Sequence, residues 1–235
     1  MNETKLMFNL GILKHFINNA LGLSYDNKQE VTGYELIVPL LEASAHNTYV
    51  ETVSNKADTL YDRSEKSLKS MMTWAYLNYI KRVSEKFEMD KEPVMLAFDY
   101  TDEDFYGDVQ GIEIYGWTRK DAVTGKFKFL TCSIVSANIP IKIPLISVPV
   151  HVGHYKSNEV LYCLSLIKDY IGKIKLILFD KSFHNNDLMF ELDKKRYPFL
   201  IFIPRKEEYK RLFEELCGGL TLFVHNFKVN KNKSK

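Results

Sequence analysis

The sequence has little of what secreted, redox-active or membrane proteins need. Its 235 residues include only three cysteines, Cys132, Cys163 and Cys217, which are widely spaced and form no CxxC pair. That pattern argues against a disulfide framework or a zinc site, so buried thiols are expected. The longest apolar stretch, residues 139–152, is interrupted by three prolines and a lysine. No run therefore approaches the ~20 residues that a membrane helix requires.

Other patterns are also missing. The first residues, Met-Asn-Glu-Thr-Lys, do not have the layout of a signal peptide, so a cytoplasmic protein without a membrane partner is expected. The eleven glycines form no GxGxxG or Walker loop. This absence weighs against an α/β protein that binds a small phosphate ligand, an alternative that stays open. A net charge of +2 neither requires nor excludes a nucleic-acid partner.

Apolar and aromatic residues are plentiful, at 46% and 13%, enough for a sizeable packed core. Residues 1–90 show helical spacing of apolar side chains. The expected helix starts are Pro39 in a first turn, a Thr48–Glu51 capping box and Asp58 as a cap. A short helix, a turn near Asn55 and a further helix predict either a helix-turn-helix DNA-binding domain or an ordinary helical bundle. The pattern leaves both open.

From Pro93 onward, strand and helix signals alternate. Strands are predicted at residues 94–98, 112–118, 127–135, 174–179 and 199–203, with Thr124-Gly125 as a turn and residues 139–150 extended. Helices are predicted around residues 160–167, 188–195 and 207–216, with Gly172 as a helix stop and Asp187 as a cap. This order indicates a mixed α/β sheet with parallel central strands. Residues 228–235 are expected to be a basic, solvated tail rather than a specific DNA arm.

Two of the predicted buried strands run directly into an aspartate, Asp99 after residues 94–98 and Asp180 after residues 174–179. If these strands are parallel neighbours, both carboxylates reach one crevice at the strand ends. Paired carboxylates need a cation between them, and Mg²⁺ or Mn²⁺ suits hard oxygen ligands. The alternative is that each aspartate is a turn former or a helix cap. The acids Asp102, Glu103, Asp104 and Asp108 are expected on a solvated loop.

Four segments in the same order resemble the insertion-sequence DDE transposases of prokaryotes. Residues 96–108 resemble their first-aspartate motif, with Tyr106-Gly107 following Asp99. Residues 176–184 resemble the second-aspartate motif, although the family usually has Arg and Gly where this chain has Lys181 and Ser182. Residues 57–63 and 197–205 are similar to a helical N-terminal segment and to the strand after the second motif. The similarity covers nearly the whole chain.

The resemblance implies a helical domain at residues 1–90 and an RNase H-like catalytic core at residues 91–227, in which flanking helices cover a mixed sheet. It further implies that Asp99 and Asp180 are catalytic metal ligands for Mg²⁺ or Mn²⁺, in a DNA transposase that cuts and joins DNA strands. Double-stranded DNA, as element ends and target, is the expected partner, and a homo-oligomer is possible.

The chain departs from the family at the third ligand, a glutamate on a later helix that follows a Tyr and an Arg. The available acids Glu207, Glu208, Glu214 and Glu215 do not follow that pattern. We therefore expect an incomplete core that ends early, weak metal binding, and activity strongly lowered or absent. A non-catalytic DNA-binding protein is the second hypothesis. A zinc site at His151, His154 and His184 is disfavoured, because residues three apart on a strand face opposite ways.

Overall fold

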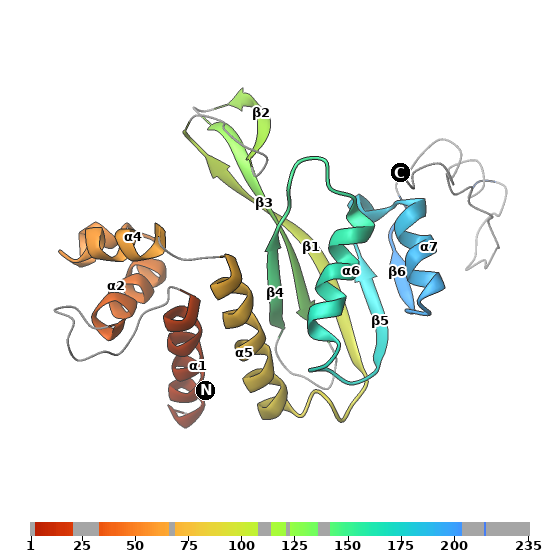
Figure 1. The fold of residues 1–235 in the computed structure, drawn as a ribbon, viewed down its shortest axis with the longest axis horizontal. Helices are drawn as coiled ribbons and strands as arrows, with labels where there is room; N and C mark the ends of the chain where they lie inside the picture. Colours follow the sequence, from red (N-terminus) through yellow and green to blue (C-terminus); the bar gives the residue numbers. More distant parts are fainter. Residues whose placement is uncertain are drawn as a thin grey trace. The chain divides into compact units, whose positions relative to one another are not determined.

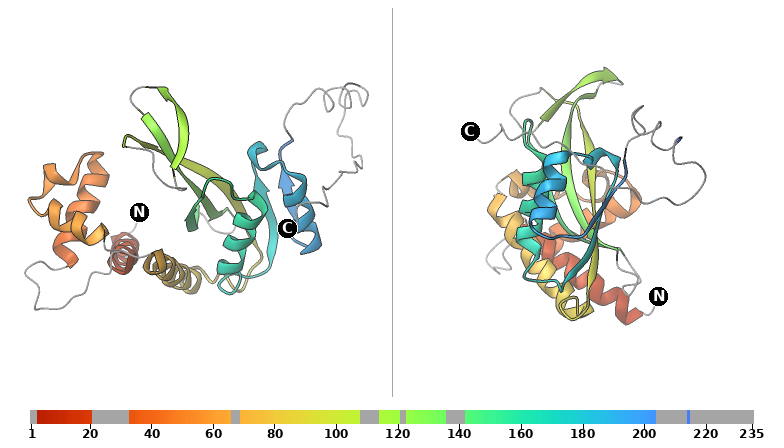
Figure 2. Two further views of the ribbon diagram at one scale, coloured as in Figure 1. Left: turned by 45° about the horizontal axis from the view of Figure 1, so that its top comes forward. Right: turned by 90° about the vertical axis from the view of Figure 1, so that its right-hand side faces the viewer.

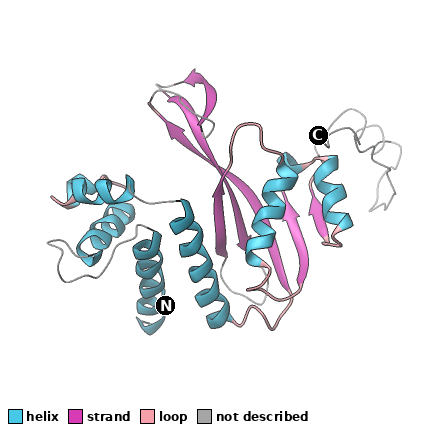
Figure 3. Ribbon diagram, viewed as in Figure 1, coloured by secondary structure: helices cyan, strands magenta, loops and turns pink. Residues whose placement is uncertain are grey.

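The computed structural model describes residues 3–20, 33–65, 69–107, 114–120, 123–135, 142–203 and 214. It divides into two compact units, Met1–Phe87 and Glu88–Lys235. The first is helical and the second contains every described strand (Figures 1 and 3). None of the described helices is long and apolar enough to cross a membrane. The helix predicted at residues 207–216 lies outside the described residues except for Glu214, which is helical and exposed.

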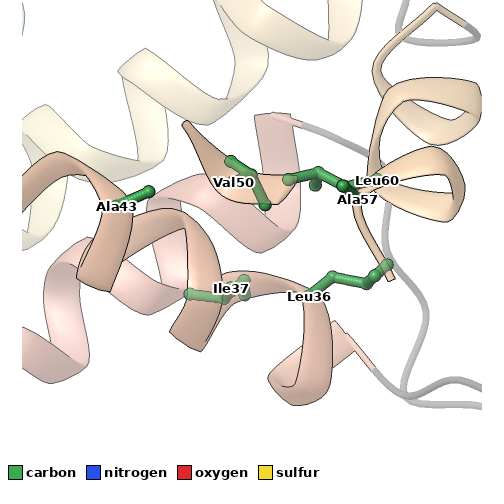
Figure 4. Packing of buried hydrophobic residues seen from close by; sticks show 6 residues of the cluster. All are labelled: Leu36, Ile37, Ala43, Val50, Ala57 and Leu60. Carbon is green, nitrogen blue, oxygen red and sulfur yellow. The ribbon is translucent and has the colours of Figure 1, made fainter. Parts of the chain in front are cut away.

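Five helices make up the described part of the first unit. They are α1 (Glu3–Ala20), α2 (Gly33–His46), α3 (Val50–Val53), α4 (Ala57–Glu65) and α5 (Lys69–Phe87). One apolar cluster joins α2, α3 and α4, because each contributes side chains that are at least nine-tenths buried (Figure 4). The cluster consists of Leu36, Ile37, Ala43, Val50, Ala57 and Leu60. Burial of this shared face, rather than helix propensity, holds the short helix α3 in place.

The predicted helix starts in this unit are wrong in detail. Pro39 lies inside α2, where it removes one backbone donor without ending the helix. Tyr49, not Thr48, is the N-cap of α3, and Thr48 shares a hydrogen bond with the hydroxyl of Thr52 instead. Asp58 is already inside α4. The short helix, the turn at residues 54–56 and the further helix are present as predicted, which leaves both interpretations of this unit open.

The second unit is built on a six-stranded mixed sheet. Its strands are β1 (Val94–Phe105), β2 (Ile114–Lys120), β3 (Val123–Ile134), β4 (Ile143–Pro149), β5 (Ile174–Phe179) and β6 (Phe199–Ile201). The order is β2-β3-β1-β5-β6, with β4 also paired to β3. β1 is antiparallel to β3 and parallel to β5, and β5 is parallel to β6. With its flanking helices, this sheet confirms the expected mixed α/β class.

Two helices, α6 (Lys156–Ile167) and α7 (Asn186–Lys194), lie side by side on one face of this sheet (Figures 1 and 2). Alternate strand residues point toward them and are buried, such as Leu96, Phe98 and Phe179. The helices contribute a matching apolar stripe that includes Leu164 and Leu188. The core of the unit therefore lies between this face and the two helices.

β1 is longer than predicted, because it continues past Asp99 to Phe105. Beyond Phe98, β1 is no longer paired with β5 but remains paired with β3. This part of β1, the start of β3 and β2 together extend past the other strands (Figure 1). The acids Asp102 and Asp104 therefore lie on a strand rather than on the solvated loop expected for them. The turn predicted at Thr124-Gly125 is also wrong, since both residues belong to β3.

Two further predicted caps have other roles. Asn185, not Asp187, is the N-cap of α7, and its side chain accepts a hydrogen bond from the Leu188 N–H at 3.1 Å. Gly172 does not terminate α6, which ends at Ile167. Its N–H instead donates to the Met89 carbonyl at 2.7 Å, and a Cβ atom at this position would lie 2.6 Å from the Glu92 carbonyl oxygen. Glycine is needed there for a close approach of two backbones.

Candidate metal site

Asp99 and Asp180 follow two residues that are partners in the sheet. Phe98 of β1 is in register with Phe179 of β5, and each aspartate is the next residue along its chain. The prediction that the two strands are adjacent and parallel is therefore confirmed. Asp180 follows the end of β5 as predicted, but Asp99 lies within β1 rather than at its end. Neighbouring strands are about 4.8 Å apart, so the backbone segments that carry the two aspartates lie close together.

Both carboxylates leave the sheet on the face opposite α6 and α7. The rings of Phe98 and Phe179 are buried toward the helices and stack with centroids 5.3 Å apart. The next residue of an extended chain points the other way. Asp99 is within β1, and Asp180 has extended backbone angles, φ −75° and ψ 177°. Both aspartates are exposed, so a hydrated cation could approach them.

Asp180 is also a helix cap. It precedes the 3-10 helix η1 (Lys181–Phe183), and its Oδ1 accepts hydrogen bonds from the Ser182 N–H at 2.9 Å and from the Ser182 hydroxyl at 2.5 Å. The capping role considered from the sequence is therefore real, but it occupies only one oxygen. Oδ2 has no hydrogen-bond partner among the described residues, which leaves one oxygen for a ligand.

Electrostatics distinguish Asp99 from the acids that follow it on β1. Asp102 and Asp104 lie opposite Lys128 and Lys126 across the β1–β3 pair. Lys126 Nζ is 3.9 Å from Asp102 Oδ2 and 3.6 Å from Asp104 Oδ1, and Lys128 Nζ is 3.9 Å from Asp102 Oδ1. Asp99 lies opposite Thr131 instead, and within the described residues it has no ion pair. Its charge is therefore available to a cation, whereas Asp102 and Asp104 are already compensated.

An aromatic layer supports the two aspartates from the helical side of the sheet. Tyr100, next to Asp99, stacks on Phe183 of η1 with centroids 4.6 Å apart and planes 6° from parallel. The Tyr100 hydroxyl donates to Glu159 Oε2 at 3.0 Å, and Glu159 is a buried residue in α6. Phe183 is fully buried. The segments that carry Asp99 and Asp180 are thus packed together beneath the candidate site.

Burial in this layer shifts two acid–base equilibria. It raises the pKa of Tyr100 far above its usual value, and the nearby negative charge of Glu159 adds to the shift. Desolvation also raises the pKa of Glu159, which the hydrogen bond from Tyr100 and the charges of His154, Lys128 and Lys156 only partly offset. Glu159 Oε1 is buried and has no hydrogen-bond partner among the described residues. A protonated Glu159 would be cheaper to bury than a carboxylate.

Within the described ranges, no group of three or more His, Cys, Asp or Glu side chains could hold a metal ion. Of the candidate third acids, Glu207, Glu208 and Glu215 lie outside those ranges. Two carboxylates still fit a cation that retains most of its waters, as Mg²⁺ usually does. Asp99 and one oxygen of Asp180 meet that requirement, since they are exposed hard oxygens and neither aspartate has an ion pair within the described residues.

The two neighbouring histidines lie on a turn rather than on a strand. The His154 N–H donates to the His151 carbonyl at 3.2 Å, and the two rings meet edge to face with centroids 5.0 Å apart. The strand geometry used against a zinc site therefore does not apply. A zinc site needs at least three protein ligands, however, and no such group is found among the described side chains.

Sequence reasoning missed the residues that position the turn after β5. Ser182 was noted only as a departure from the family's glycine, and the departure itself was the available signal, since a serine at this point adds a hydroxyl donor. Lys156, whose ammonium donates to the Ser182 carbonyl, comes from α6 and gives no local signal. Glu159 gives no local signal either, since glutamate on a helix is usually exposed.

No family model matches the chain, and no curated protein is similar to it in sequence. Solved structures that resemble it weakly include two transposase complexes. A piggyBac transposase synaptic complex with hairpin DNA is 15% identical, with a TM-score of 0.37, and the match covers 94% of this chain and 46% of that one. A Drosophila P element transposase strand transfer complex is 11% identical, with a TM-score of 0.36 and coverage of 85% and 48%. The chain thus spans less than half the length of either protein.

Proposed function

We propose that this chain is a transposase-like DNA-processing protein in which Asp99 and Asp180 together bind one divalent cation. The observation that carries this proposal is the register of β1 and β5, in which Phe98 pairs with Phe179, the residues directly before the two aspartates. The resemblance of residues 96–108 and 176–184 to the aspartate motifs of insertion-sequence DDE transposases supports the same assignment.

The cation would be Mg²⁺ or Mn²⁺, held by Asp99 and by Oδ2 of Asp180. When bound, such an ion would activate an oxygen nucleophile or stabilise the leaving oxygen of a phosphodiester. Other residues of this chain would hold the two ligands in position. Ser182 holds the other oxygen of Asp180, and the Tyr100–Phe183 stack fixes the two segments from beneath. Fixed ligand geometry is what the protein contributes to this kind of chemistry.

Double-stranded DNA is the proposed substrate. In this proposal residues 1–90 form the helical DNA-binding domain, residues 91–227 the core with the metal site, and residues 228–235 a basic tail. The exposed positions on α4 include Asp58 and Asp62, which would repel phosphates. We therefore assign DNA contacts in the first unit to other helices, such as α5 with its exposed Lys81 and Arg82.

One observation favours the non-catalytic alternative, a DNA-binding protein that does not cut. The described residues provide two carboxylates, whereas the resemblance implies three ligands in a working site. The phosphate-ligand alternative is disfavoured, because two adjacent carboxylates repel a phosphate unless a cation lies between them.

The test is nicking of supercoiled plasmid DNA by the full chain in Mn²⁺. We expect slow, metal-dependent nicking that Asp99→Asn and Asp180→Asn each abolish. Asp104→Asn is the matched control, since this aspartate lies on the same strand but pairs with Lys126, and it should nick like the wild type. Nicking that survives both substitutions would refute the site. DNA binding without any nicking, in a protein that binds Mn²⁺, would select the non-catalytic alternative.

A further inference from the structure

A lysine of α6 forms a hydrogen bond with the turn after β5. Lys156, the first residue of α6, donates from its ammonium to the carbonyl of Ser182 in η1. Ser182 in turn donates its N–H and its hydroxyl to the same oxygen of Asp180. The chain of contacts therefore runs from a helix on one face of the sheet, through the turn, to a carboxylate on the other face.

These contacts fix which oxygen of Asp180 is available. With both Ser182 donors on Oδ1, the carboxylate cannot rotate freely, and Oδ2 remains for a ligand. Donors in the shell outside a metal ligand commonly set its orientation in this way. The family's usual glycine at the position of Ser182 would supply the N–H but not the hydroxyl.

We infer that Lys156 and Ser182 are positioning residues that orient Asp180 for the cation, an inference that rests on the proposed function. Removal of Lys156 distinguishes a positioning role from a purely electrostatic effect of its charge. Lys156 is a positive charge close to the site, so on charge alone its removal should strengthen cation binding. If Lys156 acts through Ser182, its removal should weaken cation binding because Asp180 loses its orientation. The two explanations predict opposite signs.

The first experiment titrates the full chain with Mn²⁺ by calorimetry. We expect Ser182→Ala and Lys156→Met to weaken Mn²⁺ binding roughly ten-fold, the usual loss for a residue outside the first ligand shell. Ser182→Thr, which keeps the hydroxyl, should restore most of the affinity. Matched controls are Ser165→Ala and Lys168→Met, exposed residues of α6 and its C-cap, which should leave the affinity unchanged. Unchanged or tighter binding in Lys156→Met would overturn the inference.

The second experiment needs no metal. Hydrogen exchange in the metal-free chain should show a protected Ser182 amide, because its N–H is bonded to Asp180. Lys156→Met should make that amide exchange several-fold faster, while amides in the middle of β5 keep their rates. Equal exchange of the Ser182 amide in both proteins would contradict the positioning role. Absence of Mn²⁺ binding in a wild type with this exchange pattern would instead contradict the proposed function alone.

Discussion

Phe183 is the side chain on which the turn after Asp180 rests. It is fully buried and contacts the rings of both Tyr100 and Phe179. Phe183→Ala should lower the free energy of unfolding by roughly 3–5 kcal/mol, the usual loss for a buried phenylalanine. Phe190→Ala on α7 is the matched control, because that ring is 48% exposed, and it should cost much less. Urea unfolding of both variants measures the difference, and equal losses would show that the ring is not packed as described.

Glu159 should make stability depend on pH. Desolvation raises its pKa in the folded protein, so between the unfolded and folded pKa values the native state binds more protons than the unfolded state. The resulting stabilisation is fully present below the unfolded pKa and is lost as pH rises through the folded pKa.

Glu159→Gln removes this titration but keeps an oxygen that can accept from Tyr100. We expect the variant to gain stability relative to the wild type as pH increases from about 4 to 7, since glutamate titrates near 4.3 when unperturbed. Thermal unfolding across that range tests it. Glu191→Gln, at a partly exposed position of α7, should track the wild type. If the stability of Glu159→Gln and of the wild type changed in parallel with pH, a raised pKa of Glu159 would be ruled out.

At the scale of elements, Gly172 determines how the segment before β5 meets the turn before β1. Gly172→Ala would place a methyl group against backbone carbonyls that cannot rotate away. We expect it to destabilise the protein by roughly 1–3 kcal/mol, as overpacking usually does. Gly11→Ala in α1 is the opposite case, because nothing lies within 4 Å of its Cβ position, and it should stabilise the helix by roughly 0.5–1 kcal/mol. Unfolding midpoints that move in the same direction for both would contradict this explanation.

The local signals in the sequence were sufficient for most strands and for the pairing of β1 with β5. Continuous apolar runs bounded by Pro93 and Gly172 mark buried strands, and each ends at an aspartate. The extension of β1 was missed because acids are depleted in strands, and the lysines that pair with Asp102 and Asp104 lie about twenty residues later on β3. The role of Ser182 was equally hidden, since it depends on the direction of a side chain within one turn.

At the scale of the whole molecule, the proposal predicts salt-dependent binding to duplex DNA. The described residues include an exposed basic group at the C-terminal end of α7, made up of Lys194, Lys195 and Arg196. Replacing Lys195→Gln and Arg196→Asn should reduce the slope of log affinity against log salt by about 0.9 for each phosphate that the variant no longer neutralises. Asparagine is chosen because Arg196 has φ 58°, which asparagine tolerates. Gel-shift titrations at several salt concentrations measure the slope, with Lys168→Gln as control. Affinity that does not change with salt would exclude binding through the phosphates.

The central claim is that Asp99 and Asp180 share one cation, and Mn²⁺ calorimetry on the full chain tests it most directly. The wild type should bind one Mn²⁺ weakly, because only two carboxylates and water would hold it. Asp99→Asn and Asp180→Asn should each remove that binding, and the double substitution should have no further effect, whereas Asp104→Asn should bind as the wild type does. Binding that persists in either single variant, or a wild type that binds no Mn²⁺, would contradict the shared site.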